Sequence, residues 1–146
     1  MDKIQEYKKA FEDNLVRKTH YEEHHRDIMF APEFQGLLWA IDNGYLNVVK
    51  YIIDKGIDVG ARTNTALYWA CIHKQFEIFK YLVEKGADIN IRIHDNFITA
   101  SGNGSLDIVK YFVENGANID EKTKKKALWH CCRNHHTEVK EYLKTL

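Results

Sequence analysis

Three stretches of the chain have almost the same sequence: VVKYIIDKGIDV at residues 48–59, IFKYLVEKGADI at 78–89 and IVKYFVENGANI at 108–119. They start 30 residues apart, and a shorter copy, EVKEYL, follows at residues 138–143 after a one-residue insertion. A fixed period of this length is typical of repeat proteins, in which each unit is one small supersecondary structure. We therefore expect the 146-residue chain to be a series of such units.

Each unit contains two short helical patterns. In the quoted stretches, apolar residues such as Ile78, Phe79 and Leu82 recur at spacings that place them on one face of a helix. A glycine follows this second helix, where a residue with positive φ can end a helix. The first helix of each unit carries a small residue, which allows neighbouring helices to pack closely. The small residues are Ala40, Ala70, Ala100 and Cys131, and the glycines are Gly56, Gly86 and Gly116.

These residues resemble the ankyrin repeat. The family's T-P-L-H-x-A pattern is matched by TALYWA at residues 65–70, and its G-A-D-x-N segment is matched at 86–90 and 116–120. The resemblance covers about residues 36–146 and implies an all-α solenoid of stacked helix–turn–helix repeats. The period of 30 residues is shorter than the family's period of about 33. Because the missing residues follow Asn90, we expect short fingers between the repeats.

The predicted repeats occupy residues 36–64, 65–94, 95–124 and 125–146. Residues 1–35 lack the repeat columns, but their apolar residues follow helical spacing. A repeat stack needs a terminal unit with a polar outer face, so we expect 1–35 to form a helical N-terminal cap or a degenerate repeat. The short units, poor in proline and rich in Ile, Lys and Asn, resemble those of AT-rich protists, intracellular parasites and large DNA viruses of amoebae.

Composition and charge exclude several classes of protein. Lys+Arg and Asp+Glu both number 21, which argues against bulk electrostatic affinity for nucleic acid or acidic membranes. No apolar run approaches the roughly 20 residues of a membrane span, and the first residues, MDKIQE, lack the apolar core of a signal peptide. Three cysteines, two of them adjacent, fit a reducing compartment. We expect an intracellular, cytoplasmic protein, in the host cytoplasm if its source is a virus or parasite.

Two segments contain residue types that bind zinc. HYEEH at residues 20–24 matches the H-x-x-E-H pattern, in which two histidines bind the metal and the glutamate is the base. No third ligand accompanies His20 and His24, so we interpret them as part of a solvated helix face. In HCCRNHH at 130–136, Cys131 falls in the small-residue column and the last two histidines fall in a turn. We therefore expect three free thiols, no metal or cofactor, and no catalytic residues.

A rigid stack of repeats leaves the side chains of one face free to bind a partner with little ordering cost. The resemblance implies the same function, because ankyrin repeats are protein-binding modules without catalytic activity. In the family, the free positions follow the small-residue pair of each first helix and occupy the fingers, here around Arg62–Asn64, Arg92–His94 and Lys122–Lys125. The predicted contact residues are Asp42, Asn43, Arg62, Ile72, His73, Ile91, Arg92, Ile93, Asn103, Lys122, Arg133 and Asn134.

Within this set, Arg62, Arg92 and Lys122 form a basic row with a period of 30 residues. The isoleucines near its centre provide apolar anchors, and we expect a monomer that binds a protein with an apolar knob bordered by acidic groups. Four alternatives stay open. Ile91 and Ile93 cover a neighbouring finger, the Lys122–Lys126 tract binds nucleic acid or acidic lipid, the chain is a metalloenzyme that uses His20 and His24, or it is an architectural, self-associating subunit. The tryptophans Trp39, Trp69 and Trp129 line either the core or the groove.

Overall fold

The computed structural model describes residues 5, 9, 32–56 and 59–146. From Pro32 onward these residues form helices joined by short turns, and no strand occurs among them. The cap predicted for residues 1–35, including His20 and His24, lies almost entirely outside the described residues. The helices are α2 (Pro32–Asp42), α3 (Leu46–Asp54), α4 (Val59–Ile72), α5 (Phe76–Glu84), α6 (Ile93–Gly102), α7 (Leu106–Glu114), α8 (Glu121–Arg133) and α9 (Thr137–Thr145).

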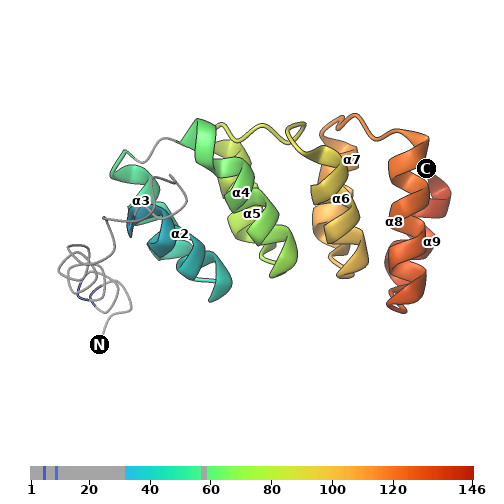
Figure 1. Ribbon diagram of the computed structural model, residues 1–146, viewed down its shortest axis with the longest axis horizontal. Coiled ribbons are helices and arrows are strands. Elements are labelled where there is room, and N and C mark those ends of the chain that lie inside the picture. The colour runs from blue at the N-terminus through green and yellow to red at the C-terminus, as the bar shows by residue number, and fades with distance from the viewer. Residues whose placement is uncertain (1–4, 6–8, 10–31, 57–58) are drawn as a thin grey trace, which may run out of the picture. The chain divides into compact units, whose positions relative to one another are not determined.

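The chain divides into two compact units, Met1–Asp58 and Val59–Leu146. In the first unit α2 packs on α3, and in the second α4 packs on α5, α6 on α7 and α8 on α9. Within the second unit, α4, α6 and α8 lie side by side in one row, and α5, α7 and α9 form a second row behind them (Figure 1). The predicted all-α solenoid of helix–turn–helix repeats is confirmed.

The core follows the predicted apolar stripes. The second helices bury their stripe residues, for example Ile78 and Leu82 of α5 and Val139 and Leu143 of α9. Burying such a side chain contributes about 1.5–3 kcal/mol, so each helix is held mainly by packing. The small-residue column agrees with the structure, because all four of its residues are fully buried. They are Ala40, Ala70, Ala100 and Cys131.

Aromatic side chains connect successive repeats in the second unit. The ring of Phe79 on α5 lies 5.8 Å from the ring of Tyr111 and 5.1 Å from that of Phe112, both on α7. Phe112 in turn packs edge-on against Phe97 of α6 at 5.9 Å. Each edge-to-face pair contributes about 0.5–1.5 kcal/mol to stability beyond the burial of the rings. These pairs therefore stabilise the packing of α5, α6 and α7.

Left-handed backbone conformations end the helices at the predicted glycines, with φ of 86° at Gly56, 101° at Gly86 and 70° at Gly116. The turn between the two helices of each repeat also needs a residue with positive φ. Glycine fills this position in two repeats, but Lys74 (φ 57°) and His135 (φ 61°) fill it in the other two. A non-glycine residue in this conformation costs about 1–2 kcal/mol, so these two turns are strained.

The fingers are shorter than expected. Residues 62–64 lie within α4, and residues 122–125 lie within α8, so neither segment is a loop. At α8 the physical reason is clear, because the carboxylate of Asp120 accepts a hydrogen bond from the backbone N–H of Thr123 at 2.7 Å. This N-cap starts the helix early, and the lysines that follow favour helix.

Candidate functional site

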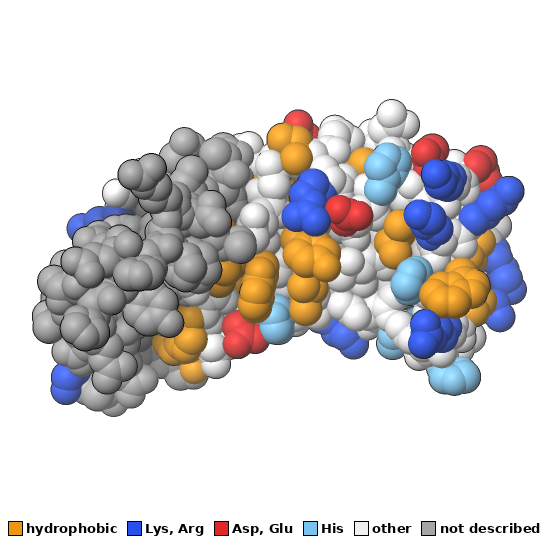
Figure 2. All heavy atoms as spheres, in the orientation of Figure 1, with side chains coloured by type: hydrophobic (Ala, Val, Ile, Leu, Met, Phe, Trp, Pro, Cys, Tyr) orange, Lys and Arg blue, Asp and Glu red, His pale blue; other side chains and the backbone are white. Residues whose placement is uncertain are grey.

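The row of first helices in the second unit presents the largest set of predicted contact residues. Of these residues, Arg92, Lys122 and Arg133 are exposed and Ile72 is partly exposed, all on or beside α4, α6 and α8. Figure 2 shows this side of the molecule, with apolar and basic side chains gathered along the three helices. Asp42 and Asn43 are also exposed, but they lie on and after α2 in the other unit. The candidate surface is therefore the α4–α6–α8 face.

Two isoleucines expected at the centre of this surface differ in their environment. Ile91 is 43% exposed, whereas Ile93 is only 6% exposed and belongs to the core. Ile93 begins α6 and is buried by packing, so it is removed from the candidate contact residues. Arg62 lies in α4 and its side chain is not among those described. The predicted basic row can therefore be followed only at Arg92 and Lys122.

Two asparagines predicted to be free instead connect neighbouring repeats. The side-chain amide of Asn103 donates a hydrogen bond to the carbonyl oxygen of Ile72 at 3.1 Å, and that of Asn134 donates to the carbonyl of Gly102 at 2.6 Å. Each bond runs from one first-helix end to the preceding one. At about 0.5–1.5 kcal/mol each, these bonds maintain the spacing of the face, so the two residues position it rather than offer free contacts.

Arg92 joins α6 to α4. Its guanidinium lies 5.2 Å from the centre of the Tyr68 ring and forms an ion pair with Asp95 at 3.1 Å. Both groups of the ion pair are exposed, so the pair contributes little to stability. It does place a partly compensated positive charge beside the Tyr68 ring.

The tryptophans line the surface and not the core. Trp39 is 42% exposed and Trp129 is 57% exposed. Trp69 is partly exposed and stacks on His73, with ring centres 5.2 Å apart. On α8 the guanidinium of Arg133 lies 5.3 Å from the centre of the Trp129 ring. Exposed aromatic residues are typical anchors of protein interfaces.

Exposed basic residues surround Trp129 on α8. From the sequence, Lys122 and Arg133 were separate candidate contacts, and residues 122–125 were expected to form a finger. The spacing of four, three and four residues between positions 122, 126, 129 and 133 is the signal that would have placed them on one helix face. We call this surface the basic stripe of α8: Lys122, Lys125, Lys126, Trp129 and Arg133.

The N-terminus of α8 carries a small polar cluster. Hydrogen bonds from Thr123 lower the pKa of the Asp120 carboxyl, with a smaller contribution from the nearby charges of His94 and Lys122. The Nδ1 atom of His94 contacts the Thr123 hydroxyl and lies 4.0 Å from an Asp120 oxygen. This cluster therefore links α6 to the start of α8.

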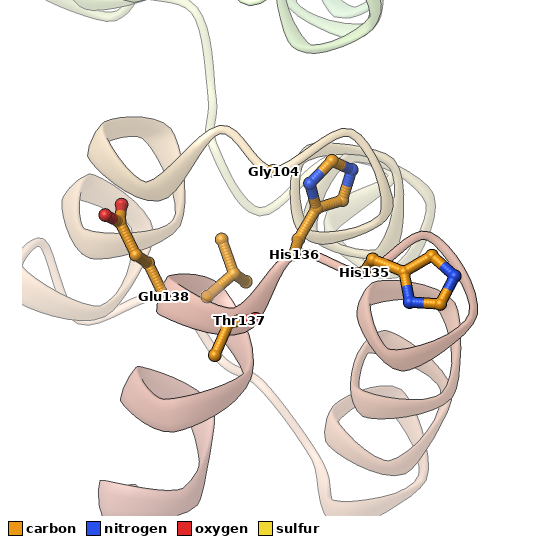
Figure 3. A pocket seen from close by; sticks show the side chains of 6 residues that line it. Gly104, His135, His136, Thr137 and Glu138 are labelled. Carbon is orange, nitrogen blue, oxygen red and sulfur yellow. The ribbon is translucent and has the colours of Figure 1, made fainter.

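A pocket of about 300 Å³ lies at the turn between α8 and α9. Its histidines do not converge on a common point: the ring of His136 lies toward Gly104, whereas His135 points away (Figure 3). A Cβ atom at Gly104 would come within 2.5 Å of the His136 ring, so this close approach requires glycine. Among the described residues no group of three or more His, Cys, Asp or Glu side chains is arranged to hold a metal ion.

The three cysteines are unpaired in the structure. Burial raises the pKa of the Cys71 thiol far above its usual value, and burial, followed by the neighbouring Cys132, raises that of Cys131. Raised pKa values disfavour the thiolate that would bind metal or act as a nucleophile. Cys132 is exposed.

The comparisons with known proteins agree with this architecture. A family model described as ankyrin repeats (3 copies) matches residues 9–93, and a single ankyrin repeat matches residues 98–124. The chain is therefore a member of the ankyrin repeat family, whose repeats are typically non-catalytic modules that bind other proteins.

Among solved structures, the ankyrin repeat domain of human ASB11 is similar, with a TM-score of 0.66 and 19% sequence identity over 95% of this chain and 67% of that chain. At this identity the likeness supports the fold alone. No curated protein matches the sequence. Within the described residues, no helix is long and apolar enough to cross a membrane.

Proposed function

We propose that this chain is a non-catalytic module that binds a partner protein on the α4–α6–α8 face. One observation carries the proposal: Ile91, just before α6, and Trp129 on α8 stay 43% and 57% exposed, and inter-repeat hydrogen bonds hold the spacing of these helices. Large apolar side chains held in this way lose little entropy on binding, and they are the usual energetic centre of an interface.

The proposal includes three further features that follow from family membership and composition. We propose that the protein is intracellular, that it acts as a monomer, and that its repeats span residues 36–64, 65–94, 95–124 and 125–146. A viral or parasite source stays a prediction. Binding of nucleic acid or acidic lipid by the Lys122–Lys126 tract is the alternative function, and its supporting observation is the exposure of Lys122, Lys125 and Lys126.

The test starts from a partner captured from the native cell, identified by mass spectrometry, purified and titrated against the full chain by calorimetry. The variant Ile72→Asp/Arg92→Glu should weaken binding by roughly tenfold or more, equivalent to about 1.4 kcal/mol. Its melting temperature should change little, because both side chains are exposed or partly exposed. Lys80→Glu, a charge reversal on α5 in the other row, is the matched control and should bind normally. Full affinity of the double variant would move the site off this face, with residues 1–35 as the next candidate.

A further inference from the structure

We infer that the basic stripe of α8 binds an acidic segment of a partner protein, with an aromatic or aliphatic side chain of that segment packed on Trp129. This inference rests on the proposed function and adds the chemical nature of the partner and the helix that recognises it. The stripe is the densest group of exposed basic side chains on the face shown in Figure 2.

The stripe is a single continuous surface. Thr123, Ala127 and Cys131 are buried on the opposite side of α8, and the stripe residues are exposed. From Lys122 to Arg133 the stripe extends over about 16 Å of helix. That length matches about five residues of extended chain or three turns of a helix, the size of a short linear segment.

The charge of the stripe is not balanced locally. The whole chain has a formal net charge of zero, but Glu121 pairs with Lys124 at 3.9 Å, on a different side of α8. Among the described residues, no carboxylate forms an ion pair with Lys125, Lys126 or Arg133. Lys122 lies close enough to Asp120 to help lower the pKa of that carboxyl. The remaining three cations are thus available to a partner's carboxylates, and Arg133 can bind one in a bidentate manner.

Trp129 gives the stripe an apolar centre. The Arg133 guanidinium covers part of its ring, and the His130 ring meets it edge-on with ring centres 4.8 Å apart. These contacts restrict the rotamer of Trp129, so little side-chain entropy is lost on binding. A large aromatic residue surrounded by basic groups fits an apolar side chain flanked by Asp or Glu.

An acidic protein segment fits the stripe better than a nucleic acid does. The cations follow one helix over about 16 Å, whereas a nucleic acid backbone needs cations along a longer track. Two exposed carboxylates, Asp120 and Glu121, lie at the start of α8. They would repel a polyanion that continued past this end of the stripe, whereas a short peptide need not reach them.

The test selects ligands from a random dodecapeptide display library against the full-length chain. The selected peptides should combine at least three Asp or Glu residues with one aromatic or leucine residue. Titrated as synthetic peptides, they should lose about tenfold or more in affinity with Trp129→Ala and with Lys126→Glu, and their affinity should fall as salt is raised. Lys80→Glu on α5 is the matched charge control and should bind like the native chain. Circular dichroism of each variant checks the fold.

The outcomes separate this inference from the proposed function. Peptides that bind Trp129→Ala normally but fail to bind Ile72→Asp would support the proposed function and overturn the α8 inference. Selection of no acidic peptides also overturns the inference. Binding of a single-stranded oligonucleotide or of phosphatidylserine vesicles that depends on Trp129 and Lys126, without acidic peptide binding, would assign the stripe to phosphate groups and contradict both proposals.

Discussion

The repeat of α6 and α7 and the repeat of α8 and α9 share one backbone plan but have different neighbours. α6 packs between α4 and α8, and α7 between α5 and α9, whereas among the described helices none packs on the far side of α8 and α9. The difference is visible at equivalent positions. Val109 of α7 is fully buried, while its counterpart on α9 is the partly exposed Lys140. Ser101 of α6 is fully buried, while its counterpart Cys132 is exposed.

The substitutions at the terminal repeat are selective. Positions that face inward keep small or apolar residues, as at Ala127, Cys131 and Leu143. The positions where Phe76 and Phe79 meet the next repeat instead carry Thr137 and Lys140 in α9. Polar residues suit a face on which none of the described helices packs. At these positions, the polarity of the residue depends on whether another repeat packs against that side of the helix.

Exchanging residues between the two repeats should have the largest effect. Val109→Lys places an ammonium group in a fully buried position without a partner, which we expect to reduce the free energy of unfolding by about 3–5 kcal/mol. The reciprocal change, Lys140→Val, should alter it by only about 0.5 kcal/mol. Urea denaturation followed by circular dichroism measures both. Equal effects of the two changes would show that α7 and α9 have the same surroundings.

Thiol reactivity should distinguish Cys71 from Cys132, which occupy equivalent positions in different repeats. Cys71 is buried with a strongly raised pKa, whereas Cys132 is exposed. Ellman's reagent should modify Cys132 at least roughly a hundredfold faster, because Cys71 reacts only when its repeat opens. The variant Cys132→Ser should lose the fast phase. Under denaturing conditions three thiols are expected, and a single thiol would reveal a disulfide.

Overpacking the small-residue column should destabilise the interior repeat more than the terminal one. Ala100→Leu inserts a larger side chain between helices on both sides, and we expect a loss of about 1–3 kcal/mol in the free energy of unfolding. Cys131→Leu should have a smaller effect, because α8 can move away from α6 on its uncovered side. Thermal melts of the two variants measure the difference. A wild-type melting temperature for Ala100→Leu would mean that the column is not at the interface.

The smallest effect concerns the helix starts. Asp120 caps α8 with its side chain, whereas Arg92 at the start of α6 makes no such hydrogen bond. Because the pKa of Asp120 is lowered in the folded chain, its charge stabilises the fold above the usual carboxyl pKa of about 4. That contribution disappears as the pH falls through the lowered value. Asp120→Asn keeps a capping residue without the charge, so its melting temperature should fall less between pH 7 and pH 3 than that of the native chain. An identical fall in both would exclude a role for this charge.

The fold could be predicted from the sequence because helix packing requires particular residue types at positions that recur in every repeat. Ala40, Ala70, Ala100 and Cys131 had to be small where helices meet, and Gly86 had to accept positive φ. The helix starts were less predictable, because α8 begins at a cap whose hydrogen bond depends on local geometry. The repeat period also does not predict that Lys74 and His135, which are not glycines, adopt a left-handed conformation.

The candidate site was predicted only in part. The family's positions lie on or beside the first helices, but two of them, Asn103 and Asn134, donate to carbonyls of the preceding repeat. A polar residue at a surface position gives no sign in the sequence that a backbone oxygen lies within reach. Ile93 was assigned to a finger, although the helix begins there and turns its side chain inward. The residues of the basic stripe share one face only because residues 122–126 are helical, and the sequence analysis expected this segment to be a finger.

The aromatic cluster of Phe79, Phe97, Tyr111 and Phe112 has a consequence for the order of folding. In a linear stack, folding starts where neighbouring units stabilise each other most and then spreads to both sides. The rings bridge the α4–α5 and α6–α7 repeats, whereas at the next junction, between α7 and α9, the position of Phe79 is occupied by the smaller Val109. We expect these two repeats to form first, with α8 and α9 docking onto them last and detaching first when the chain unfolds.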